Sequence, residues 1–202
     1  IMPDKQSVIA VSHFAGFNQL VNISLTTGKW LLLSERLFRT PIDNFALSPD
    51  GSTLAFMAFD HNRWKIHLVE FANTDGLQDE DKFIAAESSQ IQVVNLPLTG
   101  NFQSSLRWQK SGLYFSHSNQ NSDKNSDQSS KVFTRKSATR AVNIYRLNMS
   151  HGTLHQLTND LGIATQAFVT EELTSETLSS EASESKLFYL KTTSQGEQIY
   201  SL

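Results

Sequence analysis

Histidine and carboxylate side chains are the first candidates for chemistry in this chain. Asp60-His61 is followed closely by His67, and zinc sites are built from such ligands. Side chains alternate between the two faces of a strand, so His67 joins the other two only if the hairpin folds back. His151 and His155 flank a second expected turn, without a third suitable ligand nearby. We therefore predict exposed turn histidines, with no metal and no cofactor.

Serine hydrolysis is the second chemistry to consider, because the chain holds six histidines and many serines. The nucleophilic serine of many hydrolases lies in a Gly-x-Ser-x-Gly turn between a strand and a helix, and no such pentapeptide occurs. A catalytic triad is defined by geometry, so these residue types alone indicate nothing. We expect no catalytic residue in this segment, and any peptidase activity would belong to another part of a parent protein.

Polar loops are better candidates for binding than for catalysis. The loop Asp60-His61-Asn62-Arg63 lies between two expected strands. A basic cluster beside a long polar stretch consists of Lys131, Arg135, Lys136 and Arg140. Such a cluster suits an acidic partner or a phosphate, whereas the simpler interpretation is a charged flank that keeps a long loop soluble. We favour the simpler interpretation because the whole chain is negatively charged.

The composition indicates a single globular domain. The 202 residues are 39% apolar and 10% aromatic, which suits a packed core. A net charge of −3 and a pI near 6.1 argue against a nucleic-acid surface and against binding to anionic lipid. There is no cysteine, and no apolar run is long enough to insert into a bilayer. The chain begins almost directly on a strand without a signal pattern, so we expect a piece of a longer polypeptide.

A recurring pair of strand-like runs organises the sequence. The pairs are 9–11 with 20–25, 54–56 with 66–71, 113–115 with 144–147, and 187–189 with 199–202. Their leading residues Ile9, Leu54, Leu113 and Leu187 serve as common anchors. Once the longer loops are removed, the unit repeats about every 40–45 residues, and four short strands per unit match a propeller blade.

Four units follow from these anchors, with approximate bounds 1–40, 41–100, 101–160 and 161–202. Short β-branched and aromatic runs between turn residues place the strands. The expected strands are 7–12, 18–25 and 30–34; 43–48, 53–58, 64–71 and 91–94; 106–108, 113–116, 142–149 and 153–158; and 165–170, 186–191 and 197–202. The last unit lacks its fourth strand. We predict an all-β segment of about three to four four-stranded antiparallel blades, which is incomplete.

Two inserts interrupt the units. Residues 118–139 are almost all polar, and residues 171–185 are rich in serine and glutamate. Such segments bury too little apolar surface to offset their ordering entropy, so we expect flexible loops that order on binding a partner.

Two stretches resemble a known family. Ser48-Pro49-Asp50-Gly51 precedes the run 54–56, and the run 144–147 leads through His151-Gly152 to Gln156-Leu157-Thr158. Both are similar to the repeats of TolB-like, WD-repeat-like bacterial β-propellers, and the similarity covers nearly the whole chain. The resemblance implies a propeller but not one function. Similar propellers occur in TolB itself, in the gating domains of prolyl-oligopeptidase-type enzymes, and behind the membrane anchor of CadC-like regulators.

We therefore expect a non-catalytic interaction domain of a bacterial exported or membrane-anchored protein, periplasmic in a Gram-negative cell. It would bind a protein partner through loops at one end of its blades, with 59–63, 118–139 and 171–185 as the best candidates. The remaining blades of the parent chain would be its other partners. Alternatives are a periplasmic sensor segment of a CadC-like winged-helix regulator and an accessory propeller of a serine peptidase. A cytoplasmic location remains an alternative.

Overall fold

A computed structural model describes most of the chain. The described residues are 6–14, 16–33, 41–61, 63–70, 91–98, 100–102, 106–119, 141–159, 162–170, 186–193 and 195–202. Almost all of them lie in strands and turns, so the expected all-β class is confirmed.

Within the described ranges, fifteen strands follow one another, and they form three sheets. The first unit contains β1 (Ser7–Phe14), β2 (Phe17–Ser24) and β3 (Trp30–Leu32). The second contains β4 (Ile42–Leu47), β5 (Thr53–Asp60), β6 (Arg63–Glu70) and β7 (Ile91–Val93). The third contains β8 (Gly100–Phe102), β9 (Arg107–Gln109), β10 (Gly112–Asn119), β11 (Val142–Asn148) and β12 (Thr153–Gln156). The fourth contains β13 (Ile163–Thr170), β14 (Lys186–Thr193) and β15 (Gly196–Ser201).

Each unit is an antiparallel meander in which neighbours in sequence pair with each other. The second unit has the order β4-β5-β6-β7, and the third unit follows the same plan with β9, β10, β11 and β12. The parallel pairing of Val142 with Ile163 joins the third unit to the fourth within one sheet. The short strand β8, which pairs with the far end of β10, was not expected from the sequence.

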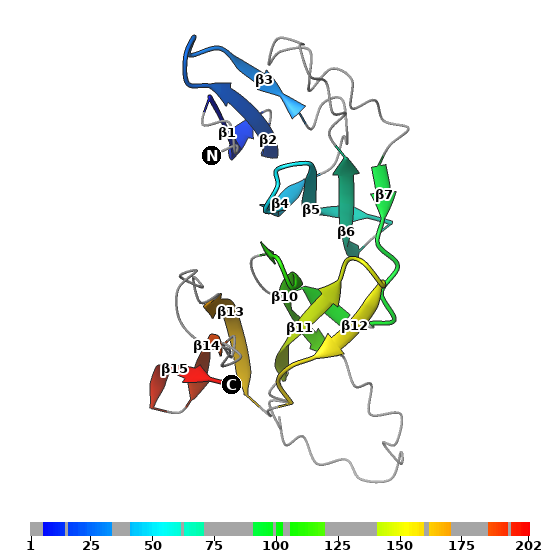
Figure 1. The fold of residues 1–202 in the computed structure, drawn as a ribbon, viewed down its shortest axis with the longest axis vertical. Helices are drawn as coiled ribbons and strands as arrows, with labels where there is room; N and C mark the ends of the chain where they lie inside the picture. Colours follow the sequence, from blue (N-terminus) through cyan, green and yellow to red (C-terminus); the bar gives the residue numbers. More distant parts are fainter. Residues whose placement is uncertain are drawn as a thin grey trace, which may run out of the picture.

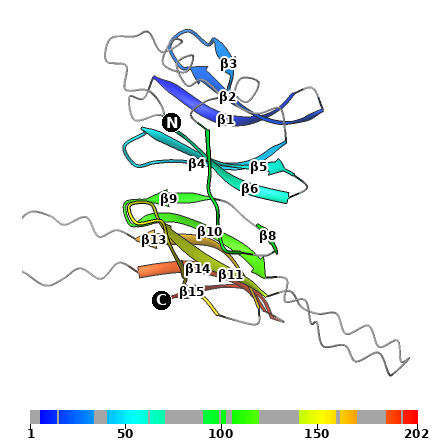
Figure 2. The same ribbon diagram turned by 90° about the vertical axis from the view of Figure 1, so that its right-hand side faces the viewer.

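The four units lie as successive layers along an open arc. Figure 1 shows this arc, with β4 on its concave side and β7 on its convex side. Turned by 90°, the layers are seen to stack face to face from β1 to β15 (Figure 2). In this account, the front face of a unit looks toward the next unit along the chain, and the back face toward the preceding one.

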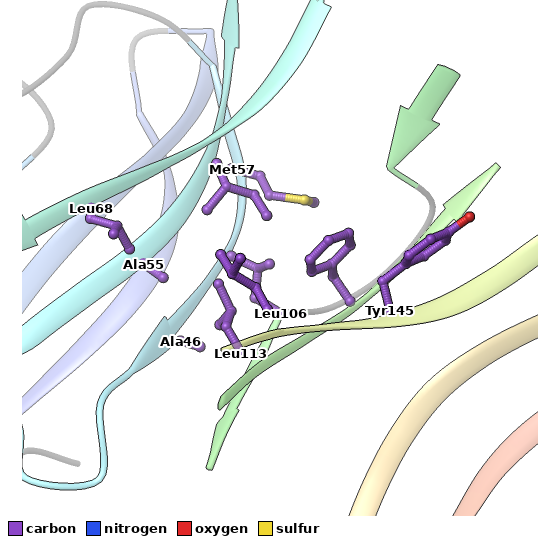
Figure 3. Close-up of a cluster of buried hydrophobic side chains, with 10 residues drawn as sticks. Ala46, Ala55, Met57, Leu68, Leu106, Leu113 and Tyr145 are labelled. Carbon is purple, nitrogen blue, oxygen red and sulfur yellow. The ribbon is translucent and has the colours of Figure 1, made fainter. Parts of the chain in front are cut away.

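Alternate residues of the long strands fill the spaces between layers, because successive side chains of a strand point to opposite faces. In β5, Leu54 and Phe56 pack back against Ile9 and Leu20 of the first unit. The intervening Ala55 and Met57 pack forward against the third unit. Figure 3 shows this second interface, in which Ala55, Met57 and Leu68 face Leu106, Leu113 and Tyr145.

The third interface continues the same alternation. Leu113 and Phe115 of β10 face back, whereas Tyr114 faces forward with Ile144 of β11. These two forward side chains pack on a cluster of the fourth unit that consists of Ala164, Ala167, Val169, Leu187 and Tyr189. Every inner layer is therefore buried on both faces, as expected for blades.

A stacked pair of rings occupies the same back-face position in three units. The pairs are Phe56 with His67 at 5.4 Å, Phe115 with Tyr145 at 5.9 Å, and Tyr189 with Tyr200 at 5.8 Å between ring centroids. Each pair joins directly opposite residues of the second and third strands. Rings of this size bury a large apolar area, so the pair is a main packing element of the repeat.

The first unit is shifted by one residue from the alignment that the sequence suggested. Ile9 packs forward with Val11, whereas Leu54, Leu113 and Leu187 all face back. Counting from the β1–β2 turn makes Val8 the equivalent of Leu54. Because side chains alternate, this single-residue shift moves the whole strand to the opposite face.

The aromatic residues of the fourth unit follow the same register. Tyr189 is the equivalent of Phe56 and Phe115, whereas its neighbour Phe188 lies on the front face beside Phe168. Trp30 also lies outside the core, with 59% of its side chain exposed.

Candidate functional site

The meander places the connections at two opposite ends of the layers. At one end, which we call the hairpin end, lie the connection between β1 and β2 in the first unit and the equivalent connections β5–β6, β10–β11 and β14–β15 in the other units. They begin after Phe14, Asp60, Asn119 and Thr193. The connections from the first strand to the second, including the turn after Leu47, lie at the opposite end.

The predicted loop 59–63 lies at the hairpin end. Asp60 pairs with Arg63 to close a two-residue turn, and both His61 and Arg63 are exposed. His61 has a φ of 47°, which is the left-handed conformation that the favoured two-residue hairpin turns require. Asn62 lies outside the described residues.

The two inserts open at different ends, which corrects the expectation that all three candidate loops share one surface. The stretch after Asn119 leaves the hairpin end between β10 and β11. The stretch after Thr170 connects the first and second strands of its unit, so it leaves from the opposite end. Apart from residues 118 and 119, the two inserts lie outside the described residues, as do Lys131, Arg135, Lys136 and Arg140.

Each unit carries a cross-strand pair of side chains one residue inside its connection at the hairpin end, and the residue types of this pair differ from unit to unit. In the first unit the exposed pair is His13 with Asn18, whose Nδ1 and Oδ1 atoms are 3.3 Å apart. In the second unit it is Phe59 with Trp64, in edge-to-face contact at 5.5 Å. The remaining pairs are Ser118 with Val142 in the third unit, which are both buried, and Thr192 with Glu197 in the fourth, which are exposed.

The sequence reading missed the pairs His13–Asn18 and Phe59–Trp64. The available signal was their spacing from the turns, because each pair lies one residue inside a two-residue hairpin connection. Imidazole, amide, indole and guanidinium groups at the end of stacked layers suit recognition by hydrogen bonding and aromatic contact.

The histidines that we considered as metal ligands lie apart, and His67 corrects our expectation of exposed histidines in turns. His67 is fully buried in β6 and stacks on Phe56, away from the exposed His61. His151 is exposed in the β11–β12 turn, where Asn148 Oδ1 accepts hydrogen bonds from the backbone amides of Ser150 and His151. Among the described residues, no three histidine, cysteine or acidic side chains gather as a metal would need. In the same part of the chain, no helix is long and apolar enough to cross a membrane.

The Ser48-Pro49-Asp50-Gly51 turn shows a local electrostatic effect at the opposite end. The Asp50 carboxylate accepts hydrogen bonds from the hydroxyls of Ser48 and Ser52 and from the Ser52 amide. Ser48 Oγ in turn accepts from the Thr53 amide at 2.9 Å. These donors, Ser48 first, lower the pKa of Asp50 below its ordinary value. The carboxylate therefore stabilises the turn.

Solved structures share the arrangement of stacked layers. TolB from Acinetobacter baumannii matches 98% of this chain with a TM-score of 0.54 at 14% identity. A putative TolB from Agrobacterium tumefaciens matches all of it with a TM-score of 0.54 at 11% identity. The tricorn protease also matches all of it, with a TM-score of 0.57 at 8% identity. The fold is an incomplete β-propeller.

The predicted TolB-like propeller resemblance is thus confirmed at the level of the fold. The four units are blades, and the arc in Figure 1 is an open set of them. The chain spans 41% and 62% of the two TolB chains and 20% of the tricorn protease chain. No family model matches the sequence, and a search of curated proteins found no match.

Proposed function

We propose that this chain is a non-catalytic interaction domain that binds a protein partner through the hairpin end of its blades. The observation that carries the proposal is that the cross-strand pairs next to the hairpin-end connections differ in residue type from blade to blade. Further into the strands, equivalent positions hold similar packing residues, such as the three stacked ring pairs. Next to the turns the residue types are no longer similar. The first blade has His13 and Asn18 at this position, and the second blade has Phe59 and Trp64.

The chemistry of this end suits a protein partner. Phe59 and Trp64 offer a partly exposed aromatic contact, and Arg63 stands beside them at the start of β6. Aromatic and arginine side chains are enriched in protein interfaces and supply much of their binding energy. The strands beneath hold these side chains on a rigid support, while the loops are free to vary.

The proposal also includes a location: the parent protein is exported or membrane-anchored in a bacterium. Its support is the likeness of the fold to two bacterial TolB structures. Fractionation of cells that produce the protein, with an antibody to this segment, tests the location. Recovery with the cytosolic fraction contradicts it.

Photo-cross-linking tests the proposed binding end. A benzoylphenylalanine is placed at His61 or, as the matched control, at His151, since both are exposed turn histidines at opposite ends of the blades. In producing cells, we expect a discrete protein adduct from position 61 and none from position 151. Equal labelling from both positions, or adducts from position 151 alone, would contradict binding at the hairpin end.

A second candidate is an accessory propeller of a serine peptidase, as the likeness to the tricorn protease suggests. The discriminating reagent is a fluorophosphonate probe, which labels activated serines. If the second candidate is correct, the parent protein is labelled outside this segment. If the interaction domain stands alone, an antibody to the segment recovers no labelled protein.

A further inference from the structure

The described part of the third blade is positively charged. It contains Arg107, Lys110 and Arg146 but no aspartate or glutamate. The whole chain, in contrast, has 20 acidic residues and a net charge of −3. The described part of the fourth blade does not compensate, because its one acidic residue, Glu197, lies at the hairpin end. The third blade is therefore a locally positive region of a negatively charged chain.

Two of these cations stand in one row across the sheet, which we call the basic row. Arg107 of β9 and Arg146 of β11 are both directly opposite Tyr114 of β10, and His155 of β12 is opposite Arg146. Tyr114 packs forward, so the row belongs to the front face of the blade. Tyr114 is buried, whereas Arg107 and His155 are exposed. The two arginines are two strands apart, with about 10 Å between their Cα atoms, so they can bind one ligand together.

The second blade shows that packing does not require such a row. At the equivalent positions it has Ala46, Ala55 and Leu68, which are all buried against the third blade. Arginine at the positions of Ala46 and Leu68 brings charge beside a blade-to-blade interface, where the loss of hydration is costly. The basic row therefore has a role other than filling space between blades.

The environment of Arg146 indicates a ligand for its guanidinium group. The residue is only partly exposed, and its Nε atom is buried without a hydrogen-bond partner among the described residues. The side chain lies beside Gly112, since a Cβ there would be 3.3 Å from the Arg146 Cγ. Next to Gly112, in the β9–β10 turn, the hydroxyl oxygens of Ser111 and Tyr114 are 2.7 Å apart. A buried charged donor is costly to leave unpaired, so an anion beside these hydroxyls would stabilise it.

We propose that Arg107 and Arg146 bind the phosphate group of a soluble small molecule at the end of the third blade opposite the hairpin end. Guanidinium groups bind phosphate and carboxylate oxygens through two parallel hydrogen bonds. Two such groups match a phosphate monoester, which carries a charge of about −1.5 to −2, better than a carboxylate with its single charge. This site lies away from Phe59 and Trp64, so it stands or falls separately from the proposed function.

The arginine Nε–H resonances of the wild-type 202-residue chain test the proposal without any substitution. Titration with glycerol 3-phosphate at low ionic strength should shift the resonances of Arg107 and Arg146 in nitrogen-15 NMR spectra. The resonance of Arg63, an exposed arginine at the hairpin end, is the internal control and should not move. Acetate at the same ionic strength should bind about tenfold more weakly or less, because it has one charge. Equal shifts of all three arginines, or equal affinity for acetate, would overturn the proposal.

Substitutions test the same site by calorimetry. Arg107→Gln and Arg146→Gln should each weaken the binding of glycerol 3-phosphate by about tenfold or more, because each removes charge-assisted hydrogen bonds. Arg146→Lys keeps the charge but not the planar pair of donors, so it should restore only part of the affinity. Lys29→Gln is the matched control, since Lys29 is an exposed cation in the β2–β3 turn of the first blade. Circular dichroism checks that the variants fold.

Two further probes identify the source of the phosphate. Inorganic phosphate should compete with glycerol 3-phosphate, because both place the same group between the arginines. Absence of competition would overturn the proposal, as would unchanged binding in both glutamine variants. Vesicles that contain phosphatidic acid present the group on a membrane surface instead. Sedimentation of the chain with these vesicles, without binding of either soluble phosphate, would contradict a soluble ligand.

Discussion

Gly112 begins β10 with a φ of +141°, where side chains are strongly disfavoured. An added Cβ would also collide with the backbone carbonyl oxygen of Leu147 on the neighbouring strand. We expect Gly112→Ala to lower the free energy of unfolding by about 3 kcal/mol, from backbone strain and the clash together. Gly152→Ala is the control, because φ is +64° there but no atom lies within 4 Å of the added Cβ. It should cost about 1 kcal/mol in urea unfolding, and equal losses would show that the β10–β11 contact is wrong.

The hydrogen bonds to Asp50 predict how the stability of the fold depends on pH. Its pKa is lowered in the folded state, so the charged carboxylate stabilises the fold above the ordinary pKa of an unfolded aspartate, which is about 3.9. That contribution is lost as the pH falls through the folded pKa. Titration of the Asp50 carboxyl carbon by NMR should give a midpoint below the ordinary value. Ser48→Ala removes the largest cause and should raise this midpoint, and an unchanged midpoint would refute the hydrogen-bonded turn.

Single residues also show where sequence reasoning succeeds. The residues Ser48 to Gly51 can be recognised as a turn because proline, aspartate and glycine have strong local preferences, and Gly51 adopts a φ of +75°. The burial of His67 was harder to foresee, since it depends on stacking with Phe56 across the sheet. A contact between strands leaves no signal in the local sequence of either.

At the scale of the strands, matched isoleucines test the repeat. Ile144 and Ile199 occupy the same position in the third and fourth blades, but only Ile144 is covered. We expect Ile144→Ala to cost about 2–4 kcal/mol, because it leaves a cavity between two blades. Ile199→Ala in dilute solution should change stability by less than about 0.5 kcal/mol. Thermal or urea unfolding at low concentration makes the comparison, and similar losses at both sites would contradict the assigned faces.

Most strands could be predicted from their β-branched and aromatic runs, but their register could not. In the first unit the run Ile9-Ala10-Val11 looks like Leu54-Ala55-Phe56, although the true match begins at Val8. Apolar residues occupy both faces of buried blades, so composition does not reveal which face is which. The turns reveal which face is which, because counting residues from them gives both the register and the pairs at the hairpin end. The strand β8 is only three residues long and offers no pattern to recognise.

At the scale of the whole molecule, the order of the strands determines at which end of the blades a connection lies, whereas the composition of the connection does not. The stretch after Thr170 joins a first strand to a second, which was enough to place it away from the hairpin end. The sequence suggested an open set of blades because the last unit lacks a strand, and the structure has that form (Figure 1). The assignment of side chains to the front or back face of each blade needed the register of the strands, which only the structure supplies.

Contacts between methyl groups and neighbouring blades test the stacked-blade arrangement most directly. Leu113 and Ile144 lie on opposite faces of the third blade. In a methyl-resolved NOE experiment, Leu113 should show cross-peaks to Ile66 or Met57 of the second blade, and Ile144 to Ala167 or Leu187 of the fourth. A sandwich of two sheets would instead leave one of these residues without a partner sheet, or give both cross-peaks to the same one. Either result would contradict the propeller.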